Sequence, residues 1–443
     1  MHSDRLLEVA AEIGDQLCRE AQPEGPGCGW YGLTPIAVTG GYSHKRGHLG
    51  ADVYSGAAGN SLFLTQLYRL TQDERTRATA IAAARGALAR AEEIEPPIRM
   101  SFYAGWMGIG FAAVVAGEVL DDRKLARDGR RLVQRAALLS ANGRPTDQFL
   151  GCASAIAPLL ALHRHSGADW PLVAASRIGD RLLASSVRRG NVRLWPPSGP
   201  MNELHRDALT GFAHGVSGIA TALLELGVAC DDPQLRDAAE EGFAYERRWY
   251  VPDQENWLDL RYIPGPDGDL NNGRTCQIQW CHGAAGIGLA RLRAYVLLEA
   301  DIYRSEAAAA VRTIKGDLKC WPNNWQPGFS LCHGVAGNSE LLIEAGRVLH
   351  DEEAHGAARN AADLGIEHFA AAGAPWPGAL GPQEIPSLLT GVAGTAWFLL
   401  RLSAPDLIPS LLLPSALELA LSQPRFGRAE RADRPLAPPP FTA

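Results

Sequence analysis

The sequence predicts an all-α protein in which seven helical hairpins close into a double α/α toroid, with an inner and an outer ring of helices. Three observations predict this fold: a short glycine signature recurs along the chain, an apolar run follows each copy, and alanine-rich stretches with charges on one side lie between the copies. No segment has a recognisable strand periodicity. A closed ring also buries the first repeat against the last, which an open array cannot do.

The glycine signature sets the register of the repeat, with two glycines three residues apart. The copies are YSGAAGN (54–60), YAGWMGI (103–109), FLGCASA (149–155), AHGVSGI (213–219), CHGAAGI (281–287), CHGVAGN (332–338) and LTGVAGT (389–395). The third copy is degenerate, because Ser154 stands where the others have their second glycine. The first glycines are 46 to 68 residues apart, which is enough for two helices and their connections.

Two kinds of helix are expected in each unit. The runs after the signatures, such as IGFAAVVAGEVL (109–120), have apolar residues at the i, i+3, i+4 spacing of buried helices. Stretches such as TRATAIAAARGALARAEE (76–93) place charges on one side of an alanine-rich helix. We therefore assign the first kind to the inner ring and the second kind to the outer ring.

The rest of the chain divides around this barrel. Residues 1–50 are expected to form an N-terminal helix and a glycine-rich loop that pack on the barrel. Residues 51–425 form the barrel domain, and residues 426–443 form a proline-rich tail. Irregular stretches at 190–210, 250–280 and 319–330 precede repeats four, five and six and are expected to be loops.

Composition excludes several classes of protein. A formal charge of −7 leaves no basic stripe to neutralise phosphates, which argues against nucleic-acid binding. No run of 18 apolar residues could span a membrane, and the charged N-terminus does not resemble a signal peptide. Eight cysteines are few for 443 residues. We expect a cytoplasmic protein, and in that compartment unusual cysteines are metal ligands or reactive thiols more often than members of disulfides.

Aligning the repeats by their first glycine isolates the residues that carry chemistry. The residue directly before that glycine is Ser55, Ala104, Leu150, His214, His282, His333 or Thr390, and the residue before that is Tyr54, Tyr103, Phe149, Ala213, Cys281, Cys332 or Leu389. Metal-binding and titratable side chains thus occupy equivalent places in three consecutive units. Because equivalent positions of a toroid face one central opening, we expect these side chains to converge.

Two Cys–His pairs at the same repeat position favour a metal site over inert buried thiols. All four residues, Cys281, His282, Cys332 and His333, would give the closed shell of a structural site, whereas three ligands would leave the open position of a catalytic zinc. Thiolate ligands select Zn²⁺ over Mg²⁺ or Ca²⁺.

Three segments, WCHGAAGIGLARL (280–292), SLCHGVAGNSELLIEAG (330–346) and SLLTGVAGTAWFLLRL (387–402), resemble the lanthionine synthetase C family. They are most similar to the cyclase domains of class II lanthipeptide synthetases. The resemblance extends from about Asp52 to Leu402, and it implies a double α/α barrel with one Zn²⁺ at its mouth. On the matching positions the zinc ligands are Cys281, Cys332 and His333.

The same resemblance implies roles for residues beside the metal. His282 is then not a ligand but a candidate acid/base or substrate-positioning group. His214 matches a histidine implicated as an acid/base, and Asp147 matches an aspartate that is a plausible partner for it. Some relatives carry an arginine four residues before the first zinc cysteine, where this chain has Gln277; Arg274 is nearby but out of register.

The activity implied is that of a zinc-dependent lanthipeptide cyclase. A thiol with a pKa of about 8.5 is only about 3% ionised at pH 7, and Zn²⁺ coordination removes this handicap of roughly 2 kcal/mol. The thiolate adds to the β-carbon of dehydroalanine or dehydrobutyrine, and a histidine, His214 or His282, protonates the enolate that results. The product is a lanthionine or methyllanthionine thioether ring.

The expected substrate is a dehydrated, ribosomally made precursor peptide. Because the repeats begin within about 55 residues of the first residue, no dehydratase region is expected, and a separate dehydratase would prepare the peptide. Two alternatives stay open. One is an enzyme that adds glutathione or another thiol to dehydroamino acids in proteins. The other is a noncatalytic, zinc-stabilised peptide-binding scaffold, which would favour a four-ligand site that includes His282.

Overall fold

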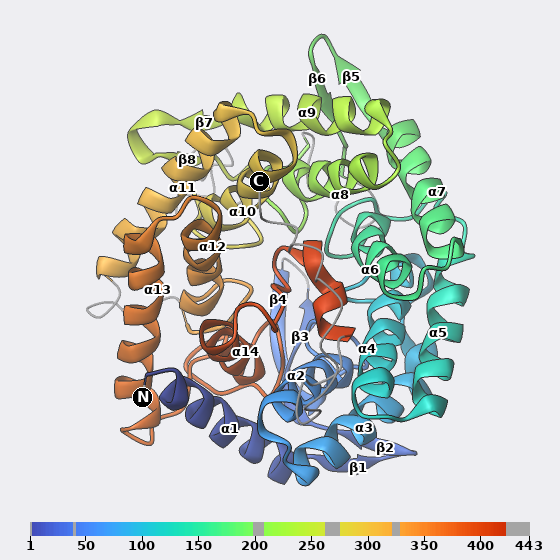
Figure 1. The fold of residues 1–443 in the computed structure, drawn as a ribbon, viewed down its shortest axis with the longest axis vertical. Helices are drawn as coiled ribbons and strands as arrows, with labels where there is room; N and C mark the ends of the chain where they lie inside the picture. The colour runs from blue at the N-terminus through green and yellow to red at the C-terminus, as the bar shows by residue number, and fades with distance from the viewer. Residues whose placement is uncertain (1, 39–40, 198–207, 262–274, 321–327, 422–443) are drawn as a thin grey trace, which may run out of the picture.

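Two concentric rings of helices form a closed α/α toroid (Figure 1), as the sequence predicted. The computed structural model describes residues 2–38, 41–197, 208–261, 275–320 and 328–421. Within these ranges it describes the side chains of all residues except 2–3, 35–38 and 41–44. Within these ranges the inner ring consists of α2 (Ala57–Thr71), α4 (Trp106–Val119), α6 (Ile156–Ser166), α8 (Val216–Ala229), α10 (Ala284–Leu298), α12 (Val335–Val348) and α14 (Val392–Ser403). The outer ring consists of α1 (His2–Glu20), α3 (Glu74–Ala89), α5 (Arg123–Ala137), α7 (Trp170–Ser185), α9 (Pro233–Arg247), α11 (Asp301–Cys320) and α13 (Glu352–Gly365).

Each inner helix begins after the first glycine of a signature, and the second glycine explains why. A Cβ atom on that second glycine would lie only 1.7 to 2.1 Å from the carbonyl oxygen of the residue six positions earlier, as it would between Gly108 and Phe102. Only glycine permits so close an approach. In the degenerate repeat the chain instead begins with a 3₁₀ turn, η3 (Cys152–Ala155), and Ser154 Oγ accepts a hydrogen bond from Phe102 N at 2.9 Å.

The seventh outer helix comes from the N-terminus of the chain. Helix α1 packs against α14 and also contacts α2 and α3 (Figure 1), with its apolar residues Leu6, Val9, Ile13 and Leu17 buried. These residues have the helical spacing of a single apolar face. The N-terminal helix is therefore the outer member of the last unit, and the ring closes where the two ends of the barrel meet.

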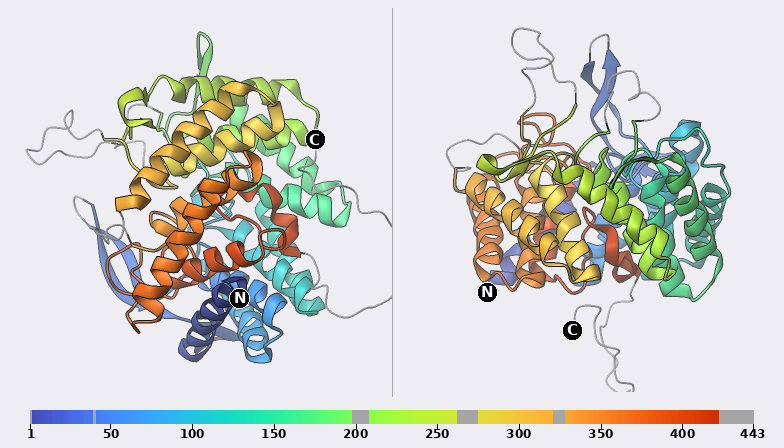
Figure 2. Two further views of the ribbon diagram at one scale, coloured as in Figure 1. Left: turned by 60° about the vertical axis from the view of Figure 1, so that its left-hand side comes forward. Right: turned by 90° about the horizontal axis from the view of Figure 1, so that it is seen from above.

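Four short antiparallel hairpins interrupt the helices. They are β1 (Gln22–Glu24) with β2 (Gly27–Gly29), β3 (Tyr31–Val38) with β4 (Gly41–His48), β5 (Val187–Arg189) with β6 (Val192–Leu194), and β7 (Tyr250–Val251) with β8 (Asn256–Trp257). The glycine-rich stretch expected as a loop on the barrel is strand β4, and its hairpin projects beyond the helices on one face (Figure 2). Pairing with β3 satisfies the backbone hydrogen bonds of β4. The sequence of β4 does not alternate between apolar and polar residues, so its periodicity did not predict a strand.

The segment after α14 fills the interior of the ring (Figure 1). Tyr103 Oη donates to Leu411 O at 2.7 Å and Trp280 Nε1 donates to Leu412 O at 2.9 Å. Two of the signature loops therefore bind this segment. It ends in η8 (Pro414–Leu421), which packs on α4 and α6. No helix in the described ranges combines the length and apolarity needed to cross a membrane.

Buried ion pairs join neighbouring helices inside the wall. Arg291 of α10 lies 2.9 Å from Glu246 of α9 and 2.6 Å from Glu306 of α11, and both Arg291 and Glu246 have no exposed side-chain surface. Arg401 of α14 is likewise fully enclosed and pairs with Glu340 and Glu344 of α12. Removing one partner of such a pair leaves a buried charge without compensation.

We predict that Arg291→Leu lowers the free energy of unfolding by about 3–5 kcal/mol, because Glu246 is then left as an unpaired buried charge. Urea unfolding followed by circular dichroism measures the loss. The matched control is Arg312→Leu, since Arg312 and Glu255 form an exposed pair, with 55% and 39% of their side-chain surfaces accessible, and such pairs contribute about 0–1 kcal/mol. Equal losses in the two variants would contradict the prediction.

Candidate metal centre

The signature loops meet at one end of the inner ring through their backbones. The residues two positions before the first glycines are joined by hydrogen bonds from Tyr54 N to Tyr103 O (2.9 Å), Leu389 N to Tyr54 O (2.8 Å), Cys332 N to Leu389 O (2.9 Å), Phe149 N to Ala213 O (2.9 Å) and Ala213 N to Cys281 O (3.2 Å). Among the described residues, no such backbone bond joins Cys281 to Cys332 or Tyr103 to Phe149. The ring of loop hydrogen bonds is therefore interrupted at two places, and one opening lies between the two cysteines.

Three of the predicted residues meet at that opening. Cys281, Cys332 and His333 each place one ligand atom within 4.8 Å of the ligand atoms of the other two. Cys332 is buried, whereas Cys281 and His333 are half-buried at the edge of the interior. A hydrogen bond with Cys332, burial and the negative charge of Cys332 raise the pKa of Cys281 well above its ordinary value, and His333 opposes them.

This donor set fits a zinc ion. Two sulfur atoms this close repel each other when both are ionised, and a divalent cation relieves that repulsion. Two thiolates and one imidazole are ligands that Zn²⁺ prefers, and three protein ligands leave the fourth tetrahedral position open. His282 is not a member of the cluster that the described residues form.

Tyr54 is a residue of this centre that the sequence analysis placed in register but gave no role. Its hydroxyl donates a hydrogen bond to Cys332 Sγ at 2.9 Å, and its ring lies 4.5 Å from that of Phe149. The signal was present in the alignment, because Tyr54 occupies the same repeat position as the two cysteines.

His214 and Asp147 form the pair that the sequence analysis expected. His214 Nδ1 lies 3.1 Å from Asp147 Oδ2, and Asp147 Oδ1 accepts hydrogen bonds from the backbone of Leu150 (2.7 Å) and Gly151 (3.0 Å). Burial alone would lower the pKa of His214. The charge and hydrogen bond of Asp147, together with Cys281, outweigh it and raise that pKa. His214 therefore keeps its proton to a higher pH than an ordinary histidine.

His282 lies beside His214 in a different electrostatic environment. The two rings stack with centroids 5.9 Å apart, and His282 is 1% exposed. Burial, and then the positive charge of Arg261, lower the pKa of His282 to about 3. A neutral imidazole is a poor source of protons, so of the two histidines considered as acids, His214 has the properties that the role requires.

An aspartate–arginine pair from the 250–280 stretch also reaches the centre. Asp259 is 1% exposed and lies 3.9 Å from His282 Nδ1. Arg261 holds Asp259 through Nε and Nη2, with Nη2 at 2.6 Å. The repeat register could not have revealed this pair, because it belongs to an insertion outside the signature. Gln277, four residues before Cys281, donates a hydrogen bond to Thr275 Oγ1 at 2.8 Å. Arg274 lies outside the described residues.

A groove of about 420 Å³ opens beside the metal donors. Its lining includes His333 and Gln279, with apolar walls formed by Phe369, Pro375 and Pro377. Its wall is held in place, since Phe329 N donates to Pro377 O at 2.8 Å and Ala379 N donates to Thr390 O at 2.8 Å. An apolar side chain next to a metal-bound group could lie in this groove.

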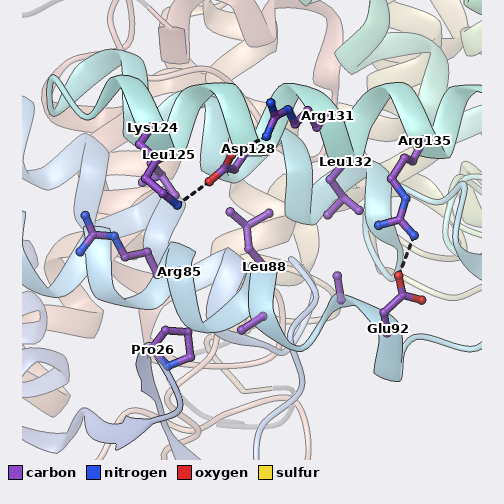
Figure 3. Close-up of a pocket in the computed structure, with 12 residues that line it drawn as sticks. Pro26, Arg85, Leu88, Glu92, Lys124, Leu125, Asp128, Arg131, Leu132 and Arg135 are labelled. Carbon is purple, nitrogen blue, oxygen red and sulfur yellow. Dashed lines mark hydrogen bonds and ion pairs between the residues drawn. The ribbon is translucent and has the colours of Figure 1, made fainter.

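A second groove, of about 510 Å³, lies on the outer wall between α3 and α5 and contains none of the predicted site residues (Figure 3). Two ion pairs lie in its lining: Lys124 is 2.8 Å from Asp128, and Arg135 is 2.7 Å from Glu92. Of these two grooves, the one beside His333 is the one that contains a candidate metal ligand.

The chain is similar to several known proteins. The model of the family described as "Lanthionine synthetase C-like protein" matches residues 47–413. A zebrafish (Danio rerio) protein named "Glutathione S-transferase LANCL1" is 23% identical over 316 residues, which are 69% of this chain and 72% of that protein. Among solved structures, nisin cyclase is similar with a TM-score of 0.61 and 14% identity, over 94% of this chain and 96% of its own. An unsaturated glucuronyl hydrolase from Streptococcus agalactiae matches with a TM-score of 0.48 and 11% identity, over 92% and 93% of the two chains.

We predict that Asp147→Asn lowers the pKa of His214, because an amide removes the charge that outweighs burial. The titration of the histidine ring protons in NMR spectra measures this change. By linkage, the pair stabilises the fold below the ordinary histidine pKa, and this contribution is lost as the pH rises through the raised pKa of His214. Asp128→Asn on the outer helix α5 is the control, and an unchanged His214 titration in Asp147→Asn would contradict the prediction.

Proposed function

Because the chain belongs to the lanthionine synthetase C-like family, we propose that it is a zinc-dependent enzyme that forms thioether rings in peptides. In this proposal the thiol of a peptide cysteine adds to dehydroalanine or dehydrobutyrine in the same peptide. The product is a lanthionine or methyllanthionine ring.

One observation carries the proposal: two cysteine sulfurs and one imidazole form a three-donor cluster at the ring opening, with His214 and Asp147 nearby. Cys281, Cys332 and His333 would hold the metal. A bound Zn²⁺ would supply the positive charge that keeps a substrate thiol ionised at neutral pH. A noncatalytic scaffold, in contrast, would be better served by a closed four-ligand site, and it has no use for a half-buried His–Asp pair.

The remaining residues would orient the substrate and move a proton. Addition of sulfur to the β-carbon leaves an enolate, which needs a proton at the α-carbon. Asp147 engages His214 at Nδ1, so Nε2 is the nitrogen from which His214 would deliver that proton. His282, uncharged and stacked on His214, would keep the neighbouring ring in place.

The groove beside His333 supports a peptide substrate. Its described lining has apolar residues and no Asp, Glu, Lys or Arg side chain, so it suits uncharged residues that flank a cysteine. We propose a dehydrated precursor peptide as the substrate, prepared by a separate dehydratase in the cytoplasm.

A second candidate function is the addition of glutathione to dehydroamino acids in proteins. It is favoured by the name of the relative "Glutathione S-transferase LANCL1", and it would use the same metal, thiol and proton donor. The two candidates differ only in the thiol that attacks. The described lining of the groove has no Lys or Arg side chain to pair with the two carboxylates of glutathione, which favours the peptide thiol.

We predict that the purified protein binds about one Zn²⁺ per chain, and that Cys281→Ala and Cys332→Ala each lose most of it, because either change leaves only two ligands. Elemental analysis by mass spectrometry measures the metal. His282→Asn is the matched control and should keep its zinc. Loss of zinc in that control would favour the four-ligand scaffold.

We predict that the protein cyclises a dehydrated, cysteine-containing peptide, and that His214→Asn slows this reaction by about 10²–10⁴-fold without loss of zinc, since it removes the proton donor. Cyclisation leaves the mass unchanged, so protection of the cysteine from alkylation is the readout. Parallel reactions with glutathione report the second function through a mass increase. The cyclase proposal fails if protection does not exceed the spontaneous rate, or if Cys332→Ala retains full activity.

A further inference from the structure

The segment that carries Arg261 is fixed between two of the loops that form the centre. Asp259 N donates to Thr275 O at 2.9 Å, and Leu258 pairs with Cys276 in an antiparallel bridge. Thr275 and Cys276 belong to the segment that leads to Cys281. On its other side, Leu258 O accepts a hydrogen bond from Thr210 Oγ1, in the loop that leads to His214. The backbone of Leu258 and Asp259 is therefore held by the segments that lead to His214 and to Cys281.

The guanidinium of Arg261 is oriented by a buried carboxylate. Asp259 accepts hydrogen bonds from Arg261 Nε at 3.0 Å and Nη2 at 2.6 Å, and a third from the backbone N of Arg261 at 3.0 Å. The Asp259 side chain is 1% exposed, whereas the Arg261 side chain is 30% exposed. Within the part of the chain that the structure describes, Nη1 of Arg261 has no hydrogen-bond partner.

The Asp259–Arg261 pair lies beside the two imidazoles of the centre. Asp259 Oδ1 lies 3.9 Å from His282 Nδ1, and the rings of His282 and His214 stack with centroids 5.9 Å apart. Thr210, whose hydroxyl donates to Leu258 O, also has its carbonyl oxygen 3.2 Å from His282 Nδ1. The carboxylate that orients Arg261 is therefore itself next to the imidazole pair.

We propose that Arg261 is a catalytic residue that donates hydrogen bonds to the carbonyl oxygen of the dehydrated residue while negative charge develops there. This role rests on the proposed function. The thiolate sulfur forms a bond to the β-carbon, and the Cα=Cβ electron pair moves toward the carbonyl to give an enolate. A proton delivered to the α-carbon then restores the C=O bond, so that no redox partner is needed.

The other described residues near the centre are less suited to this role. Gln277 carries no charge, and Asp147 engages His214, which is needed to deliver the proton. An arginine keeps its proton throughout the reaction, so it can stabilise an oxyanion without competing as an acid. Asp259 acts as a positioning residue, because it holds the guanidinium in one orientation.

The test compares Arg261→Met, Arg261→Lys and the control Arg312→Met with the wild-type protein on a dehydrated, cysteine-containing peptide. Arg312 also holds a carboxylate, Glu255, but on the outer helix α11. We expect Arg261→Met to lower kcat by about 10²–10³-fold with little change in KM, because the interaction forms only in the transition state. Arg261→Lys should retain part of kcat, and Arg312→Met should match the wild type.

Two further measurements separate catalysis from a structural role. Zinc content, and the calorimetric affinity for a peptide with alanine in place of dehydroalanine, should stay within about 3-fold of the wild-type values in Arg261→Met, since the ground state gains little from this interaction. Arg261→Met leaves Asp259 as a buried, unpaired charge that could unfold the segment. A double variant, Arg261→Met with Asp259→Asn, removes this charge and is measured alongside.

The outcomes are distinct. If the wild type cyclises the peptide and Arg261→Met does so with an unchanged kcat, the role of Arg261 is wrong while the proposed function stands. A loss of zinc or of analogue affinity equal to the loss of activity would also overturn the role, because it would show a structural effect. Failure of the wild type to cyclise the peptide would overturn the proposed function together with this role.

Discussion

The close approach of the second glycine of each signature to a carbonyl oxygen six residues earlier is the contact on which the rest of the structure depends. A Cβ atom at Gly286 would lie 1.9 Å from Trp280 O, and one at Gly337 would lie 1.8 Å from Leu331 O. The missing side chain lets each loop fold back tightly onto the start of its inner helix. The loops can then hydrogen-bond to one another across neighbouring units and bring their side chains to one opening.

The chemistry depends on departures from that repeat. A ring of identical units would present identical side chains, but here the loops of three consecutive units carry His214, Cys281 with His282, and Cys332 with His333. One of the two openings in the ring of loop hydrogen bonds lies between Cys281 and Cys332, the two candidate cysteine ligands. The two stacked imidazoles differ in pKa, because Asp147 outweighs burial and raises the pKa of His214, whereas burial, and then Arg261, lower the pKa of His282. Equivalent positions thus acquire different environments from their neighbours.

Buried ion pairs join neighbouring helices in the wall of the toroid, and burying their charges costs free energy. Arg291 and Arg401 are fully buried between helices, each with two glutamates. Such pairs gain little net stability over apolar packing, but a mispaired arrangement would be far more expensive. We infer that they help fix which helices are neighbours in a ring whose units have similar apolar faces.

The sequence by itself determined the repeat, the α/α toroid and the residues that belong to equivalent positions, because glycines at a constant spacing and helical apolar periodicity are local features. It also gave the expectation that Cys281, Cys332 and His333 come together, which the structure reproduces as a cluster. Three features required the tertiary structure. Helix α1 joins the last unit, β4 pairs with β3, and Arg261 reaches the centre from an insertion. Each depends on which segments meet in space, since ring closure, strand pairing and long-range charge contacts leave no periodic signal in the chain.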